Sequence, residues 1–259
     1  MLNYLSAEFY KLRFHKGLYV GTGLLLLLEL LVFLPGVMVR EQEYIPKDTL
    51  LAFLGAAMSV GIIIAPIFAA MVFDNQNGNG TLKNEVVFGV PKSRIFIGKL
   101  AAGAIVGTGI AILAIGFFLL LTLCLGGKAR GEASLLDFFL EWITVQWLTW
   151  LSVYAFSFLM LALIGSPATA MTLVYLVTMV SLVMSPVICD SDLHFIWRLM
   201  ASLSFTAPLA LVGVSERSLG VILPLLGESV LLYALVICLV WWGLSIGGGI
   251  LLLRRREIK

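Results

Sequence analysis

Six long apolar segments are the feature that most constrains the fold of this chain. They cover residues 18–39, 50–73, 100–125, 138–164, 168–188 and 228–253. Each has about 20 residues or more, enough for a helix to cross the ~30 Å hydrocarbon core of a bilayer. Lipid offers the peptide backbone no hydrogen-bonding partner, so such segments must be helical. The pattern therefore predicts an all-α membrane protein with six transmembrane helices.

Composition supports the same class. Charged residues make up 12% of the chain and the mean hydropathy is +1.05, whereas soluble domains carry about 25% charged residues. A large soluble helical core is the alternative. However, residues 21–39 and 229–253 are apolar on every helical face, as membrane spans are. We therefore expect residues 1–259 to form a single transmembrane domain.

The distribution of positive charge predicts the orientation. An even number of spans places both termini on one side. That side holds eleven of the 17 Lys and Arg residues, and the other side holds six. The eleven are Lys11, Arg13, Lys16, Lys83, Lys92, Arg94, Lys99, Arg254, Arg255, Arg256 and Lys259. The positive-inside rule then predicts that both termini of this multi-pass protein are cytoplasmic.

Residues 1–16 are too polar to insert but carry a helical pattern. Apolar side chains recur at one face, and polar ones fall on the others. The apolar set is Leu2, Leu5, Phe9 and Leu12, and the polar set is Glu8, Lys11 and His15. This spacing predicts an amphipathic helix in the cytoplasmic interface, with its cations near anionic headgroups.

Residues 189–227 precede the last span and are harder to assign. Residues 194–214 are mostly apolar but contain Arg198 and Pro208. A seventh span is the alternative, and it would move the basic C-terminus outward against the charge rule. We expect an external region of short, partly inserted helices broken at Pro208. One of them should dip into the outer leaflet and turn back near residues 204–214.

Residues 74–99 form a polar interruption between the second and third spans. The run from residue 75 reads NQNGNGTLKNEVVFGVPKSRIFIGKL, and its glycine-rich start predicts a turn. Thr81 is placed to cap a short helix over residues 82–88, which Gly89 and Pro91 would end. Ser93 would cap the helix that enters the third span. A loop that only returns the chain is the alternative.

Two stretches resemble a known family. GTLKNEVVFGVPKSRIFIGKL resembles the cytoplasmic loop of ABC-type-2 transporter permeases, and AEFYKLR resembles the N-terminal start of the same family. The chain has GVPKS where the family more often has G-I-S-R. The resemblance implies that residues 2–15 form an elbow helix and that the loop holds a coupling helix. This helix would insert into a groove of a separate ATPase through Thr81, Leu82, Glu85, Val86, Val87 and Phe88.

The resemblance also implies a function. The chain would be the permease subunit of an ATP-driven exporter in the bacterial cytoplasmic membrane, forming half of the pathway beside a second, identical or related permease. Its substrate would be an antimicrobial or signalling peptide or another amphipathic compound. The sequence has no Walker A pattern, so we expect ATP and Mg²⁺ only on the partner ATPase. We expect no cofactor, no enzymatic activity and no nucleic-acid partner for this chain.

Two other functions remain open at this point. An ion-driven secondary transporter would favour several buried acids or broken helices, and only Glu29 lies deep in a span. An intramembrane enzyme would need paired catalytic groups, yet the only histidines are His15 and His194. The three cysteines have no metal-binding spacing. Neither alternative explains the polar loop.

Glu29 is the strongest single candidate for a functional residue within a span. It lies near the middle of the first span, where inserting a charge costs roughly 2.5–3.5 kcal/mol. It is expected to line the pathway or to pair across a dimer interface. The alternative is a hydrogen bond to a neighbouring Ser or Thr that only shapes packing.

Small and aromatic residues give weaker signals. GxxxG spacings at Gly17/Gly21, Gly103/Gly107 and Gly243/Gly247 are candidate close-packing faces. We expect the deeper tryptophans, Trp147, Trp150, Trp241 and Trp242, to serve packing, with a substrate-binding box as the alternative.

Overall fold

The computed structural model describes residues 2–38, 47–74, 89–125, 134–164, 166–184, 200, 202–211 and 229–255, and these residues contain helices and no strand. An all-α fold is therefore confirmed for the described part of the chain. The helices are α1 (Leu2–Arg13), α2 (Lys16–Met38), α3 (Lys47–Asp74), α5 (Lys92–Leu125), α6 (Ser134–Ile164), α7 (Pro167–Met184), α9 (Ala207–Leu211) and α10 (Val230–Arg255).

The six long helices coincide with the six apolar segments expected to span the bilayer. Most of them extend beyond the apolar part. Helix α5 begins at Lys92, eight residues before its apolar segment and close to the start that the sequence predicted at Ser93. Apolarity marks where a helix is in lipid, whereas the helix itself continues through polar turns outside the hydrocarbon.

Length and composition identify spans within the described residues. Lys92–Leu121, Leu140–Ile164 and Val230–Leu252 are long and apolar enough to cross a membrane. A fourth span results if α1 and α2 are taken together, although they meet at a 65° bend. Val60–Phe73 and Pro167–Val183 are shorter apolar stretches. The protein is therefore a multi-pass membrane protein.

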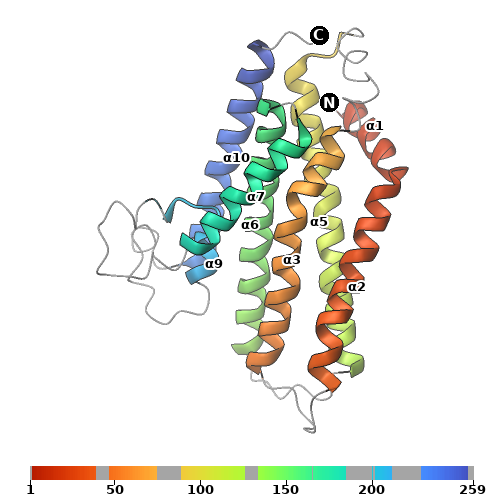
Figure 1. The fold of residues 1–259 in the computed structure, drawn as a ribbon, viewed down its shortest axis with the longest axis vertical. Helices are drawn as coiled ribbons and strands as arrows, with labels where there is room; N and C mark the ends of the chain where they lie inside the picture. The colour runs from red at the N-terminus through yellow and green to blue at the C-terminus, as the bar shows by residue number, and fades with distance from the viewer. Residues whose placement is uncertain are drawn as a thin grey trace.

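Helix α6 is the centre of the bundle. It packs against α3, α7 and α10 (Figure 1). Within its most apolar window 61% of residues are buried, against 28% for α5 and 33% for α10. Its core side chains include Tyr154 and Phe158, which are fully buried. Helices α5 and α10 instead present large apolar side chains to the outside, as lipid-facing helices do.

Hydroxyl side chains inside the bundle bond mainly to their own helix. Thr149, Ser157 and Thr178 each donate to the carbonyl four residues earlier, at 2.6–2.9 Å. In α3, Pro66 lacks an N–H group, and Tyr175 of α7 donates to the Ile63 carbonyl in the preceding turn at 2.9 Å. These bonds satisfy polar groups that lipid cannot.

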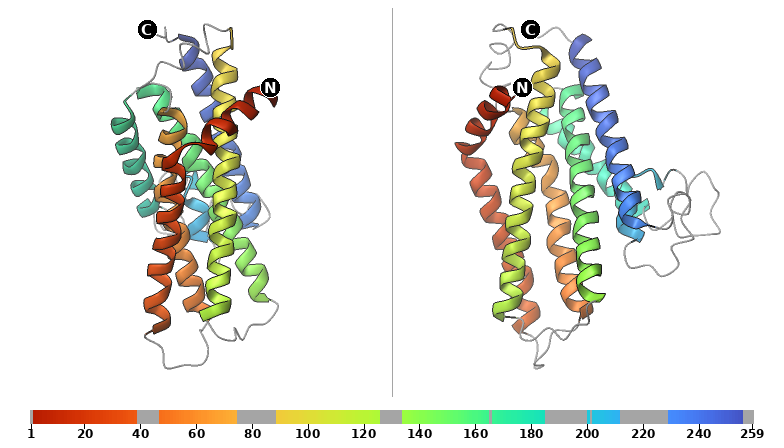
Figure 2. Two further views of the ribbon diagram at one scale, coloured as in Figure 1. Left: turned by 90° about the vertical axis from the view of Figure 1, so that its right-hand side faces the viewer. Right: turned by 180° about the vertical axis from the view of Figure 1, so that it is seen from behind.

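One end of the bundle gathers the start and the end of the described chain. Helix α1, the end of α3, the start of α5 and the end of α10 all lie at this end (Figures 1 and 2). These elements carry most of the cations that the sequence places on one side, among them Lys11, Arg13 and Arg94. The start of α1 and the end of α10 thus lie at the same end of the described bundle.

Residues 202–211 pack into the opposite half of the bundle. Phe205 is buried between Phe156 of α6 and Trp241 of α10, and Thr206 bonds to Ser181 of α7 at 2.5 Å. Pro208 lies in the first turn of α9, a position where its missing N–H is tolerated. The break expected at Pro208 therefore lies on its N-terminal side, before α9. The rest of the region expected to be re-entrant lies outside the described residues.

Candidate functional site

The two family-like stretches meet where α1 crosses α5 (Figure 2). Gly98 allows this close approach, because a Cβ at Gly98 would lie 2.6 Å from the Tyr4 ring. Leu12 is buried, and Leu5 and Phe9 pack against the core of the bundle. The three described side chains of the predicted apolar face, Leu5, Phe9 and Leu12, therefore pack on protein.

A buried ion pair joins the same two helices. The Lys99 Nζ lies 3.4 Å from Glu8 Oε2, and their side chains are 3% and 4% exposed. Lys11 Nζ lies 2.8 Å from the other Glu8 oxygen and is 44% exposed. The expectation that Glu8 faces away from the apolar side is wrong, because the carboxylate is drawn inward as the counter-charge of Lys99. A helical pattern cannot show this, since Lys99 is 91 residues away.

The coupling segment itself lies outside the described residues, so Thr81, Leu82, Glu85, Val86, Val87 and Phe88 receive no structural description. The residues that follow it, from Gly89 onward, are described. Gly89 has φ +82°, the left-handed conformation in which glycine commonly follows a helix. Helix α5 starts at Lys92, and the Pro91 carbonyl accepts from Arg94 N at 2.9 Å. Ser93 therefore lies inside the first turn, and its predicted role as the cap is wrong.

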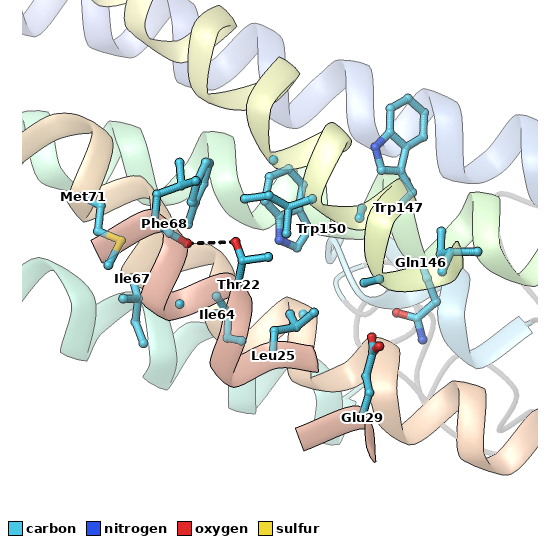
Figure 3. Close-up of a pocket in the computed structure, with 18 of the residues that line it drawn as sticks. Thr22, Leu25, Glu29, Ile64, Ile67, Phe68, Met71, Gln146, Trp147 and Trp150 are labelled. Atoms are coloured by element: carbon cyan, nitrogen blue, oxygen red, sulfur yellow. Dashed lines mark hydrogen bonds between the residues drawn. The ribbon is translucent and has the colours of Figure 1, made fainter. Parts of the chain in front are cut away.

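A cavity of about 110 Å³ lies among α2, α3, α5 and α6. Its walls are mainly apolar and aromatic, with Phe68, Trp147 and Trp150 among them. Glu29 of α2 and Gln146 of α6 both point into it and toward one another (Figure 3). Glu29 is 6% exposed and Gln146 is 5% exposed. The one acid that sequence placed deep in a span thus lines an internal space.

Both polar groups have unsatisfied acceptors. Within the described chain, Glu29 Oε2 and Gln146 Oε1 have no hydrogen-bond partner. Two nearby donors are engaged elsewhere. Thr22 donates to the Leu18 carbonyl at 2.8 Å (Figure 3). Trp147 Nε1 likewise donates to Thr108 at 3.2 Å. Thr22 therefore does not satisfy Glu29 in the way the packing interpretation expects.

The structure also tests two other predictions from the sequence, on the GxxxG spacings and on the deeper tryptophans. A Cβ at Gly103 or Gly107 would lie 2.1 Å from Tyr154 or Trp150, so this GxxxG pair is a close-packing face between α5 and α6. Trp150 stacks on Tyr154 with centroids 5.4 Å apart, and Trp242 Nε1 donates to the Leu151 carbonyl at 3.1 Å. These deeper tryptophans serve packing, as expected, although Trp147 and Trp150 also wall the cavity.

Sequence reasoning missed the Glu8–Lys99 pair and Gln146. Signals for both were present, since Glu8 and Lys99 lie in the two family-like stretches and Gln146 is a polar residue in an apolar span. For a metal, the described residues contain no group of three or more His, Cys, Asp or Glu side chains with suitable placement.

Comparison with known proteins gives one family. The family model described as ABC-2 family transporter protein matches residues 4–181. Comparison with the curated proteins finds no match. The matched range contains all of α1 except its first two residues, the polar loop, and every residue of the cavity and of the Glu8–Lys99 pair.

Proposed function

Because this chain belongs to the ABC-2 transporter family, we propose that it is the permease subunit of an ATP-driven exporter that works with a separate ATPase. The family match over residues 4–181 is the observation that carries the proposal. One such subunit forms half of a translocation pathway, with a second identical or related permease forming the rest. The export substrate we propose is an amphipathic compound, with antimicrobial or signalling peptides as the leading class.

The topology we propose has six spans in a bacterial cytoplasmic membrane, with both termini in the cytoplasm. Six long helices at the predicted segments support the count. The shared location of α1, the start of α5 and the end of α10 supports an even number of crossings (Figure 1). The concentration of Lys and Arg at that end supports its cytoplasmic assignment. Helix α1 would then be the elbow helix at the cytoplasmic interface.

Coupling to the ATPase is proposed for residues 81–88. This segment connects two helices whose ends lie at the proposed cytoplasmic end, between Asp74 of α3 and Lys92 of α5. Its apolar side chains would fit a groove of the ATPase. The Glu8–Lys99 pair lies beside the base of α5, so movement of the loop would reach α1 and α5 together.

Glu29 is proposed as a pathway residue. Its side chain points into the internal cavity with Gln146 (Figure 3), which favours the pathway role over pairing across a dimer interface. No lining residue offers a catalytic pair, so an intramembrane enzyme gains no support from the described chain.

The coupling role is tested with a double variant, Val87→Asp with Phe88→Ala. A buried aromatic anchor contributes about 2 kcal/mol or more to such a contact. We therefore expect the ATPase to be lost on co-purification, or its hydrolysis in lipid to stop responding to substrate, while the spans still insert.

Phe14→Ala is the matched control, because Phe14 is 64% exposed and lies at the same end of the bundle. Its co-purification should match wild type. If the double variant retains both the ATPase and substrate-stimulated hydrolysis, residues 81–88 are only a connecting loop.

A further inference from the structure

The cavity among α2, α3, α5 and α6 is mainly apolar but contains the polar side chains of Glu29 and Gln146. Four helices line it, and its described lining includes an acid but neither Lys nor Arg. Glu29 and Gln146 are each more than nine-tenths buried and face the same space. We propose that this cavity binds the primary ammonium group of a hydrophobic amine, with Glu29 and Gln146 as its acceptors.

The hydrogen-bonding inventory favours a donor ligand. Glu29 Oε2 and Gln146 Oε1 lack partners in the described part of the molecule, and a buried acceptor without a donor is destabilising. Two neighbouring donors, Thr22 and Trp147, are committed to other acceptors. A primary ammonium carries three N–H donors and no acceptor. It can therefore satisfy both oxygens at once, which a carboxylate or ether ligand cannot.

Charge points to the same ligand. An ionised carboxylate is costly in a low-dielectric interior unless a cation accompanies it. The lining supplies aromatic rings from Trp147 and Trp150, and ring faces attract ammonium groups. An ammonium ligand would supply the missing positive charge.

Size limits what enters. The cavity volume is about 110 Å³, and an apolar cavity of ~150 Å³ is known to accept benzene. Glycines on three of the four helices, among them Gly21, Gly61 and Gly107, leave this space open. A compact amine or the amine end of a longer amphiphile fits this volume. That such an amine is the exported compound rests on the proposed function, whereas its binding does not.

The experiment titrates the purified full chain in lipid nanodiscs with benzylammonium, without any ATPase. Binding is followed by calorimetry and by the fluorescence of the cavity tryptophans, excited beyond the absorption of the probe. Benzyl alcohol, which has the same shape and no charge, is the comparison ligand. We expect saturable binding of benzylammonium. The affinity for benzyl alcohol should be lower by roughly tenfold or more, which is the ratio expected when a charged hydrogen bond is lost.

Variants of Glu29 and Gln146 test whether the probe binds at this cavity. Glu29→Gln keeps the shape and should weaken benzylammonium binding roughly tenfold or more, and Gln146→Leu should weaken it several-fold. Glu141→Gln is the matched control on α6, because Glu141 does not line the cavity, and it should bind like wild type. If one variant fails to fold, the other variant and the wild-type preference for ammonium over alcohol still decide.

Three results would overturn the site: no saturable binding of benzylammonium, equal affinity for benzyl alcohol, or unchanged affinity in both cavity variants. Equal affinity for the two probes would mean that Glu29 and Gln146 hydrogen-bond to one another and form a packing contact. Because no ATPase is present, failure of this test leaves the exporter assignment untouched. Loss of ATPase association, conversely, would leave the amine site standing.

Discussion

At the residue scale, glycine sets the distance between α5 and α6. Gly103 faces Tyr154, whose hydroxyl donates to the Leu100 carbonyl at 3.3 Å and whose ring stacks on Trp150. Tyr154 is fully buried and has no room to swing away. Gly109, six residues along α5, is exposed, and an added Cβ there meets no described atom within 4 Å. The two positions therefore separate packing from helix propensity.

We predict opposite effects of alanine at these glycines. Gly103→Ala should lower stability, because overpacking a rigid contact costs about 1–3 kcal/mol, more than the ~1 kcal/mol gained in helix propensity. Gly109→Ala should be neutral or slightly stabilising. Thermal unfolding of both variants in one detergent is the measurement. Equal midpoints would show that α5 and α6 separate easily at Gly103.

At the element scale, the Glu8–Lys99 pair fixes α1 on α5. Both side chains are almost fully buried, and removing one partner of such a pair costs about 3–5 kcal/mol because the other charge is left buried. Replacing both charges by apolar groups is often nearly neutral. The pair thus provides a direct test of how α1 is attached.

Lys99→Met should therefore destabilise the protein strongly, and the double variant Glu8→Leu with Lys99→Met should recover much of the loss. Lys11→Met is the control. It removes a partner of the same carboxylate, but Lys11 is 44% exposed, so its effect should stay within about 1 kcal/mol. A double-mutant cycle of thermal stabilities measures the coupling. Additive single effects would mean that the two charges do not stabilise one another.

The same elements show what sequence can and cannot predict. The long helices were predictable because lipid requires continuous apolar faces, which hydropathy records directly. Hydropathy does not show the start of α5 at Lys92, because polar turns outside the lipid leave no such signal. Gly89, Pro91 and Ser93 placed that start within about two residues, although Ser93 is not the cap. The burial of Glu8 was missed because its partner comes from a distant part of the chain. Glu29 was found as a buried acid, whereas its neighbour Gln146 required the packing of α2 against α6.

At the scale of the whole molecule, the proposed ATPase contact and the proposed amine site lie in different parts of the bundle. One end holds α1, the buried ion pair and the base of the loop proposed to contact the ATPase (Figure 1). The proposed amine site lies among four helices, of which α3 ends and α5 begins at that end (Figure 1). Helices α2 and α5, which line the cavity, also flank α1. Motion at the loop therefore has a packed route to the cavity through α5.

The six-span topology gives the last prediction. In a background where Cys124, Cys189 and Cys238 are replaced by alanine, single cysteines are introduced by Asn77→Cys, Lys128→Cys or Lys259→Cys. A membrane-impermeant maleimide applied to intact cells should label only Lys128→Cys, because the positive-inside rule places the loop after the third span outside and the other two positions inside. Permeabilised cells should label all three, which controls for reactivity. External labelling of Lys259→Cys would require an odd number of crossings. In that case residues 194–214 would be a seventh span, and the loop and the C-terminus would not face the ATPase together.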